Sequence, residues 1–397
     1  MLRSQHLDVG RLDALGDGSR LGNGPVVEPI GLVQVDKILG PDTVLLIICA
    51  NRPEYLRQSL DAVIKHYPRH EDFPIVISQD GYSSEVDAVI NHFTTRLQSS
   101  LVGGRAVIDV RHIHHDNSGY YENGYSQLAA HYKWALNQVF SGGSPRVRKT
   151  GPATSVRRVI ILEEDLVIAP DFFELFAATK GLLDEDPSLL AVSAWNDNGR
   201  GSCVHRPDAL YRSDFFPGLG WMMPLRIWDE LGPIWPSAYW DDWLREPSRR
   251  KGRHTIRPEV CRTLHIGQRG VSNAQYSEFL NSIKLNADFT PFTRMDLGYV
   301  ASTDAWDDYY FDAIRRADLV RLEEVRGGRH VPLHDIKIRY DRIEGGSDSF
   351  SAAAAWAGAM DNVKAGVPRT AYRGIVTVWK DNAYVHLVPK SLRADMS

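Results

Sequence analysis

Three short apolar runs, each followed directly by polar residues, constrain the fold of this chain more than any other feature. The runs are Val44-Leu-Leu-Ile-Ile-Cys-Ala50, Pro74-Ile-Val-Ile-Ser78 and Arg158-Val-Ile-Ile-Leu162. Continuous apolar runs of this length are typical of strands buried on both faces of a parallel sheet. Another strand is expected at Val107–His112, and helical spacing is found in Pro53–Tyr67, Ser84–Leu97 and Ser126–Phe140. Strands that alternate with helices predict an α/β fold.

The polar residues at the ends of the three runs are Asn51-Arg52, Gln79-Asp80 and Glu163-Glu164-Asp165. In an open α/β sheet, ligands bind beyond the carboxyl ends of the strands. We therefore expect these side chains to face one crevice.

The local composition of the sequence predicts that the chain has four parts. Residues 1–40 are rich in Gly, Asp and Arg and are expected to be a tail, and 41–267 form the α/β domain, although Val192–Gln275 looks loop-rich. Residues 268–296 form a loop and linker, and 297–397 form a smaller α+β domain. In that domain we expect a helix at Phe350–Val363 and a hairpin of Gly374–Val378 with Tyr384–Leu387.

Composition narrows the class of ligand. The 397 residues include 46 Lys and Arg against 50 Asp and Glu, so the net charge is −4 and no basic field that would attract nucleic acid is expected. A small-molecule partner is favoured. Three cysteines allow one intramolecular disulfide at most. No apolar stretch approaches the ~20 residues that a membrane span needs, so the sequence predicts a soluble chain without a transmembrane segment.

The acid triplet Glu163-Glu164-Asp165 is the most informative segment. Three carboxylates at the end of a buried strand repel one another unless a cation compensates them. A hard cation such as Mg²⁺ or Mn²⁺ binds one or two carboxylates and completes its sphere with water and phosphate oxygens. The alternative is a solvated turn that caps the next helix.

A second pair of acids, Asp241 and Asp242, lies between Trp240 and Trp243. One carboxylate in such a setting can act as a general base while its neighbour is held ionised by a donor, for which Arg245 is available. The alternative is an aromatic-flanked turn with ordinary salt bridges.

Weaker signals surround these acids. The glycine-bearing segment 267–273, which contains Val271 and Ser272, could close over a phosphate or be a surface turn. Arg52 suits a phosphate or a surface ion pair. Asp80 could recognise a nucleobase or start a turn, and His131 is more often a core residue. Finally, His112, His114, His115 and Asp116 match no standard zinc spacing, and we predict no zinc site from them.

Six segments in one order resemble the family of β-1,2-N-acetylglucosaminyltransferases, from about residue 43 to 389, and its N-glycan branch most closely. The segments are Glu163–Glu174, Ser193–Gly199, Asp214–Trp221, Trp240–Trp243, Gly270–Ser272 and Gly366–Thr377. The resemblance implies a GT-A fold: a Rossmann-like nucleotide-sugar domain over 41–267, a donor-closing loop and linker over 268–296, and the smaller domain over 297–397.

The resemblance also implies a reaction. N-acetylglucosamine would pass from UDP-GlcNAc to the 2-hydroxyl of a terminal α-1,3-mannose of an N-glycan, with inversion and with Mn²⁺. Asp241 matches the catalytic base and Asp165 the metal ligand. The matches to donor-binding residues are Arg52, Asp80, His131, Glu163, Glu164, Val271 and Ser272.

The chain departs from the family pattern at several positions, and its residues are also compatible with other functions. Glu164 stands where the family usually has Asp, as in the branch that acts on O-linked mannose. Animal members have cysteines where this chain has Ala50 and Gly81. The family works in the Golgi, but its usual membrane anchor is not visible. The alternatives are transfer to O-linked mannose and a non-catalytic sugar-binding protein; a dinucleotide oxidoreductase is disfavoured because no GxGxxG follows the first strand.

Overall fold

The computed structural model describes residues 39–68, 73–99, 108–119, 121–140, 155–268, 277–327 and 334–392. These residues belong to one compact unit. The predicted tail, 1–40, lies outside them except for its last two residues. No helix among the described residues has both the length and the apolar character needed to cross a membrane.

A mixed sheet forms the centre of the described part, with its eight strands in the order β3-β2-β1-β4-β8-β6-β9-β7. The strands are β1 (Thr43–Cys49), β2 (Ile75–Asp80), β3 (Val110–His115), β4 (Arg158–Glu163), β6 (Leu189–Ser193), β7 (Leu210–Ser213), β8 (Trp221–Pro224) and β9 (His254–Pro258). Strands β3, β2, β1 and β4 run parallel, whereas β8 is antiparallel to both β4 and β6. The carboxyl ends of β1, β2 and β4 therefore share one edge.

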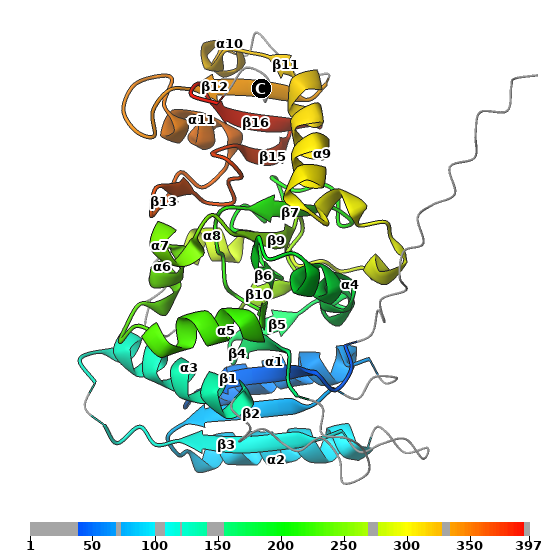
Figure 1. Ribbon diagram of the computed structural model, residues 1–397, viewed down its shortest axis with the longest axis vertical. Coiled ribbons are helices and arrows are strands. Elements are labelled where there is room, and N and C mark those ends of the chain that lie inside the picture. The colour runs from blue at the N-terminus through cyan, green and yellow to red at the C-terminus, as the bar shows by residue number, and fades with distance from the viewer. Residues whose placement is uncertain are drawn as a thin grey trace, which may run out of the picture. The chain divides into compact units, whose positions relative to one another are not determined.

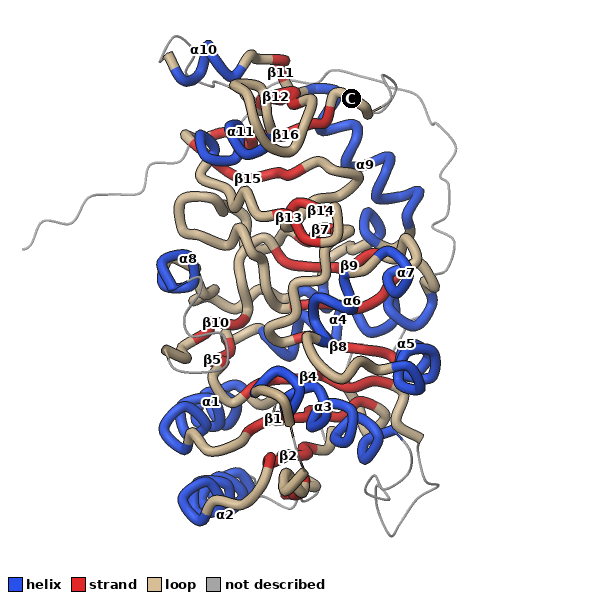
Figure 2. The backbone as a smooth tube through the Cα atoms, turned by 90° about the vertical axis from the view of Figure 1, so that its left-hand side faces the viewer, coloured by secondary structure: helices blue, strands red, loops and turns tan. Residues whose placement is uncertain are grey.

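Helices cover both faces of this sheet (Figures 1 and 2). They are α1 (Pro53–His66), α2 (Ser84–Ser99) and α4 (Phe172–Glu185) on one face, and α3 (Gly124–Phe140) and α5 (Leu225–Leu231) on the other. Strand β1 shows why the run is continuously apolar: Leu45 and Ile47 enter one core, while Val44 and Leu46 enter the other. The predicted α/β class is confirmed.

A second sheet, with the order β11-β12-β16-β15, lies in the C-terminal part. Its strands are β11 (Asp318–Leu319), β12 (Ile336–Tyr340), β15 (Val376–Lys380) and β16 (Ala383–Pro389), accompanied by α9 (Thr303–Arg316), α10 (Leu322–Arg326) and α11 (Phe350–Ala357). The predicted hairpin is confirmed, and its two turn residues, Asp381 and Asn382, both have positive φ, as a tight two-residue turn requires. Phe350 and Val385 pack in a core that belongs to this sheet.

Two predictions about the boundaries of elements were wrong. The helix expected to reach Val363 ends at Ala357, because Gly358 adopts the left-handed conformation that terminates helices. The third strand begins at Val110 instead of Val107. The described part of Val192–Gln275 is rich in loops, as predicted, but it also supplies β7, β8 and β9; β7 and β8 have only four residues each, too few for a periodic pattern to show.

Several short elements complete the structure. They are β5 (Leu166–Ile168), β10 (Thr263–His265), β13 (Val363–Lys364), β14 (Val367–Pro368), α6 (Trp240–Arg245), α7 (Pro247–Arg250), α8 (Ser277–Asn281) and the 3₁₀ turns Gly232–Ile234, Phe292–Arg294 and Gly298–Val300. Strand β5 follows the acid triplet directly in the sequence, and β10 pairs antiparallel with it.

Candidate active site

A cavity of about 850 Å³ opens beyond the carboxyl ends of β1, β2 and β4. This volume is within the usual range for small-molecule sites. The predicted site residues that line it are Arg52, Asp80, His131, Glu163, Glu164, Asp165 and Asp241. Val271 and Ser272 lie outside the described residues. The prediction of one shared crevice is confirmed except for Gln79, whose side chain contacts His112 instead, because successive residues of a strand point to opposite faces.

Glu163, at the end of β4, accepts a hydrogen bond from the buried hydroxyl of Tyr132, with an O–O distance of 2.6 Å. Burial, and then the negative charge of Asp165, raise the pKa of Glu163 to about 7, although the Tyr132 hydroxyl opposes this shift. The carboxyl therefore titrates near neutral pH.

Glu164 reaches back toward the end of β1. Its two carboxylate oxygens accept hydrogen bonds from the backbone N–H of Ala50, at 3.1 Å, and from Nε of Arg52, at 2.6 Å. Burial raises the pKa of Glu164, and the Arg52 guanidinium opposes that shift. Because Glu164 and Asp165 are only 3% and 4% exposed, the solvated-turn alternative is wrong.

The two carboxylate oxygens of Asp165 have different surroundings. Oδ2 lies 2.9 Å from a guanidinium nitrogen of Arg52 and 3.4 Å from Nε2 of His265, whereas Oδ1 is buried and has no hydrogen-bond partner among the described residues. Burial opposes ionisation, but the hydrogen bond and charge of His265, together with Arg52, lower the pKa of Asp165 below its usual value. An ionised carboxylate with one unpartnered oxygen suits a hard divalent cation.

His265 was not predicted from the sequence. The pairing of β10 with β5 places His265 opposite Leu166, and so beside Asp165. Gly267 follows closely, and a Cβ at this position would lie 2.5 Å from Oδ2 of Asp165. The three-residue strand that carries His265 is too short for a sequence pattern to predict it.

Asp80 and His131, two of the predicted donor-binding residues, both line the cavity. One oxygen of Asp80 is 2.7 Å from Nδ1 of His115, and the other accepts a hydrogen bond of 2.7 Å from Gln127. His131 is buried, with Nε2 2.8 Å from the hydroxyl of Ser78, and burial lowers its pKa to about 4. The imidazole of His131 is therefore neutral at pH 7.

The Asp241–Asp242 pair lies in the first turn of α6, a helix of only six residues. The chain enters this helix through Tyr239, whose φ of 49° is unusual for a residue with a side chain. Trp240 is buried and stacks on Tyr132, with ring centroids 4.4 Å apart. The indole therefore fixes the helix while both carboxylates stay 42% exposed.

Arg245 joins the two acids of α6. One guanidinium nitrogen lies 2.8 Å from Oδ2 of Asp241 and 2.7 Å from Oδ1 of Asp242. Lys364 contacts the other oxygen of Asp242 at 3.0 Å. Partial burial opposes ionisation, but Lys364 and Arg245 lower the pKa of Asp242.

The remaining wall of the cavity is largely apolar and was also missed from the sequence. Its residues include Trp195, Phe279, Leu280, Ile283 and Met360. Arg369, in the segment that leads into the second sheet, also lines the cavity and pairs with Asp197 at 2.7 Å. These residues come from distant segments, so no local pattern marks them.

Comparison with solved structures finds partial similarity at low sequence identity. The mannosyltransferase PcManGT from Pyrobaculum calidifontis, in complex with GDP-Man and Mn²⁺, has a TM-score of 0.37 and 18% identity, covering 59% of this chain and 60% of that one. GalNAc-T7 with UDP, GalNAc and Mn²⁺ has a TM-score of 0.35 and 14% identity, covering 60% and 48%. Scores this low support no conclusion about this chain.

Sequence relatives are more informative. The α-1,3-mannosyl-glycoprotein 2-β-N-acetylglucosaminyltransferase of Arabidopsis thaliana is 38% identical over 339 residues, which cover 85% of this chain and 71% of that protein. The α-1,6-mannosyl-glycoprotein 2-β-N-acetylglucosaminyltransferase of Rattus norvegicus is 27% identical over 163 residues, 34% of this chain and 35% of that protein. The model of the GNT-I family matches residues 19–396. The chain with this cavity and these two acidic regions therefore belongs to the GNT-I family.

Proposed function

We propose that this chain is an inverting, metal-dependent glycosyltransferase that moves N-acetylglucosamine from UDP-GlcNAc to the 2-hydroxyl of a terminal α-1,3-mannose of an N-glycan. One observation carries the proposal: in a chain of the GNT-I family, Asp165 and Asp241 line the same cavity. A metal ligand and a general base are the two acidic functions that this transfer needs.

At the donor end, Oδ1 of Asp165 is the atom that would hold Mn²⁺, because it is buried and lacks a hydrogen-bond partner among the described residues. When bound, Mn²⁺ would neutralise part of the charge on the diphosphate. Arg52 lies 2.9 Å from the other oxygen of Asp165 and can contact the same diphosphate. Glu163 and Glu164 would border the sugar nucleotide, and Asp80 and His131 the uracil ring. We assign Val271 and Ser272 to the loop that closes over the donor.

At the acceptor end, Asp241 would act as the general base. The mannose 2-hydroxyl oxygen attacks the anomeric carbon, the bond from that carbon to the diphosphate breaks, and the hydroxyl proton passes to Asp241. Exposure toward the cavity allows Asp241 to meet a sugar hydroxyl. Arg245, which contacts one oxygen of Asp241, would orient the carboxylate.

The wider assignment follows the same proposal. We assign 41–267 to a GT-A nucleotide-sugar domain, 268–296 to the donor-closing loop and linker, and 297–397 to the smaller domain. The proposed acceptor is a mannose-terminated glycoprotein glycan, and the proposed compartment is the Golgi.

Glu164, which suggested O-linked mannose as an alternative acceptor, has a structural explanation. Its longer side chain spans from β4 to the Ala50 N–H and Arg52 at the end of β1. These contacts lie at the donor end, so Glu164 is no evidence for a different acceptor.

The test is transfer by the purified chain from UDP-GlcNAc to a Man5 N-glycan, with Mn²⁺ and then with a chelator, read by mass. We expect metal-dependent addition of one N-acetylhexosamine. An O-mannosyl peptide serves as the parallel acceptor. Transfer to that peptide alone would replace the proposed acceptor, and donor binding without transfer to either would indicate a non-catalytic sugar-binding protein.

A further inference from the structure

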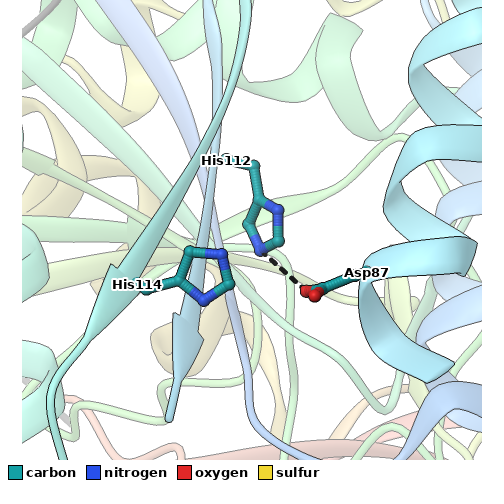
Figure 3. A group of neighbouring side chains, drawn as sticks. All are labelled: Asp87, His112 and His114. Atoms are coloured by element: carbon teal, nitrogen blue, oxygen red, sulfur yellow. Dashed lines mark ion pairs between the residues drawn. The ribbon is translucent and has the colours of Figure 1, made fainter. Parts of the chain in front are cut away.

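Asp87, His112 and His114 form a cluster of side chains outside the proposed active site (Figure 3). His112 and His114 are two residues apart on β3 and point to one face of the sheet, whereas His115 points to the other, because successive residues of a strand point to opposite faces. His115 contacts Asp80, beside the cavity, whereas His112 and His114 lie near Asp87 of α2. The cluster therefore lies across the sheet from the cavity.

The three side chains point toward one another (Figure 3), and one ligand atom from each lies within 4.8 Å of the others. Nε2 of His112 is 3.9 Å from Oδ1 of Asp87. Nδ1 of His114 is 3.2 Å from the carbonyl oxygen of Gly81 and can donate its hydrogen there, which leaves Nε2 with a free lone pair. The ring of Tyr82 stacks on His114 at 4.5 Å and fixes its plane.

The side-chain amide of Gln79 shows that two of these ligand atoms face one point. When the Gln79 oxygen accepts from the Ser83 N–H at 2.9 Å, its NH₂ group donates to Oδ1 of Asp87 at 2.9 Å and to Nε2 of His112 at 2.8 Å. Both atoms are then acceptors whose lone pairs converge. The Gln79 nitrogen occupies this point, so a cation satisfies the same lone pairs when the buried Gln79 amide turns away from Asp87 and His112.

The spacing of the histidines alone predicted no zinc site, but the fold brings Asp87 of α2 to them, and we propose that Asp87, His112 and His114 bind a transition-metal ion of the Zn²⁺ type. Two imidazole nitrogens and one carboxylate oxygen are the ligands that Zn²⁺ favours, whereas Mn²⁺ and Mg²⁺ favour oxygen ligands alone. A hydrogen bond from a ligating histidine to a backbone carbonyl, as in His114, is the usual support for such a ligand. Water would complete a tetrahedral sphere.

The cluster can both admit an ion and adjust to it. The side chains of His112 and Asp87 are 20% and 39% exposed, so an ion can reach them from solvent. Bonds of about 2.0–2.2 Å to zinc require the ligand atoms to move closer together than they are now. Once bound, the ion would tie α2 to β3, the edge strand of the large sheet.

Zinc binding to the metal-free full chain, measured by calorimetry with ZnCl₂, tests the proposal. We expect one zinc per chain at this site, with affinity reduced about tenfold or more in His114→Gln and in Asp87→Asn, since each loses a ligand. His92→Gln is the matched control, because His92 is exposed on the same helix as Asp87. Asp165→Asn removes the proposed ligand of the active site, so zinc that still binds to this variant is held by the cluster, whereas His92→Gln should bind like the wild type.

Equal zinc affinity in His114→Gln and the wild type, or loss of zinc binding in Asp165→Asn alone, would overturn the proposal, as would the absence of zinc binding. Thermal unfolding without metal checks that each variant is folded, and zinc should raise the Tm of the wild type more than that of His114→Gln. If either ligand variant is unfolded, His112→Gln replaces it. Loss of the visible absorption of bound Co²⁺ in that variant would support the site, and an unchanged spectrum would contradict it.

Discussion

The two acidic regions of the cavity differ in how deeply their carboxylates are buried beside cationic side chains. At the end of β4, Glu164 and Asp165 are almost fully buried and held by Arg52. On α6, Asp241 and Asp242 share Arg245 but remain 42% exposed on a helix of six residues. The first region is built to keep charges in fixed positions, whereas the second leaves a carboxylate open to exchange a proton.

This difference has a physical basis in the elements that carry the acids. A strand end buried between two helical layers cannot hold a carboxylate without a compensating partner, because the desolvation cost is large. The first turn of a surface helix can hold one, since water and the helix N-terminus both stabilise it. The four predictions that follow test this comparison, from the largest expected effect to the smallest.

Replacing the proposed base should have the largest effect. We expect Asp241→Asn to lower kcat by roughly 10²–10⁴-fold, because the amide cannot accept the hydroxyl proton. Donor affinity should be nearly unchanged, since Asp165 and Arg52 remain. Transfer to Man5 and calorimetric binding of UDP-GlcNAc with Mn²⁺ measure the two quantities.

Asp242→Asn is the matched control for this prediction. Asp242 has the same exposure and also contacts Arg245, but Lys364 holds its second oxygen. Its replacement should cost much less activity than that of Asp241. If the two variants lose activity equally, the acids of α6 act as a structural pair and the base lies elsewhere.

Replacing Asp165, whose Oδ1 has no hydrogen-bond partner among the described residues, should lower the affinity for the donor instead of the rate of transfer. We expect Asp165→Asn to weaken Mn²⁺-dependent binding of UDP-GlcNAc by about 10–100-fold, the scale of a perturbed metal site. Binding measured with a chelator should change little between the variant and the wild type. A variant that keeps metal-dependent donor binding would show that Asp165 is not the metal ligand.

The same contrast explains what the sequence could predict. The acids at the end of β4 follow a continuous apolar run, so their burial and their shared crevice could be expected. His265 could not be assigned, because its position depends on the pairing of two three-residue strands. Lys364 is 122 residues from Asp242, and no local pattern connects them. Short elements and distant polar contacts are specified by tertiary packing, which periodicity does not report.

The raised pKa of Glu163 predicts a pH-dependent contribution to stability. In the unfolded chain this carboxyl has the ordinary pKa of 4.5, whereas in the native state its pKa is about 7. Between these two pH values, the native state therefore keeps a proton that the unfolded state has lost. The free energy of unfolding therefore falls as pH rises from 4.5 to 7, by about 2–3 kcal/mol for this group. We expect Glu163→Gln, which can still accept from Tyr132, to flatten this slope.

Urea unfolding of both proteins at several pH values, without metal, measures that difference. The comparison between proteins is needed because other groups titrate in the same range, among them His265, whose pKa is raised by the Asp165 carboxylate although burial opposes it. Parallel curves for wild type and variant would mean that Glu163 is already ionised in the native state.

The smallest effect should come from shortening Glu164. Glu164→Asp restores the residue that the resemblance leads us to expect, but the shorter side chain cannot keep both the Ala50 N–H and Arg52 at hydrogen-bond distance. Loss of one charge-assisted hydrogen bond should lower the free energy of unfolding by about 1–2 kcal/mol. Glu54→Asp, at an exposed position in the first turn of α1, should change it by less than ~0.5 kcal/mol. Equal stability of the two variants would show that the contacts of Glu164 with Arg52 and Ala50 do not stabilise the fold, and that the extra methylene of Glu164 does not connect β4 to β1.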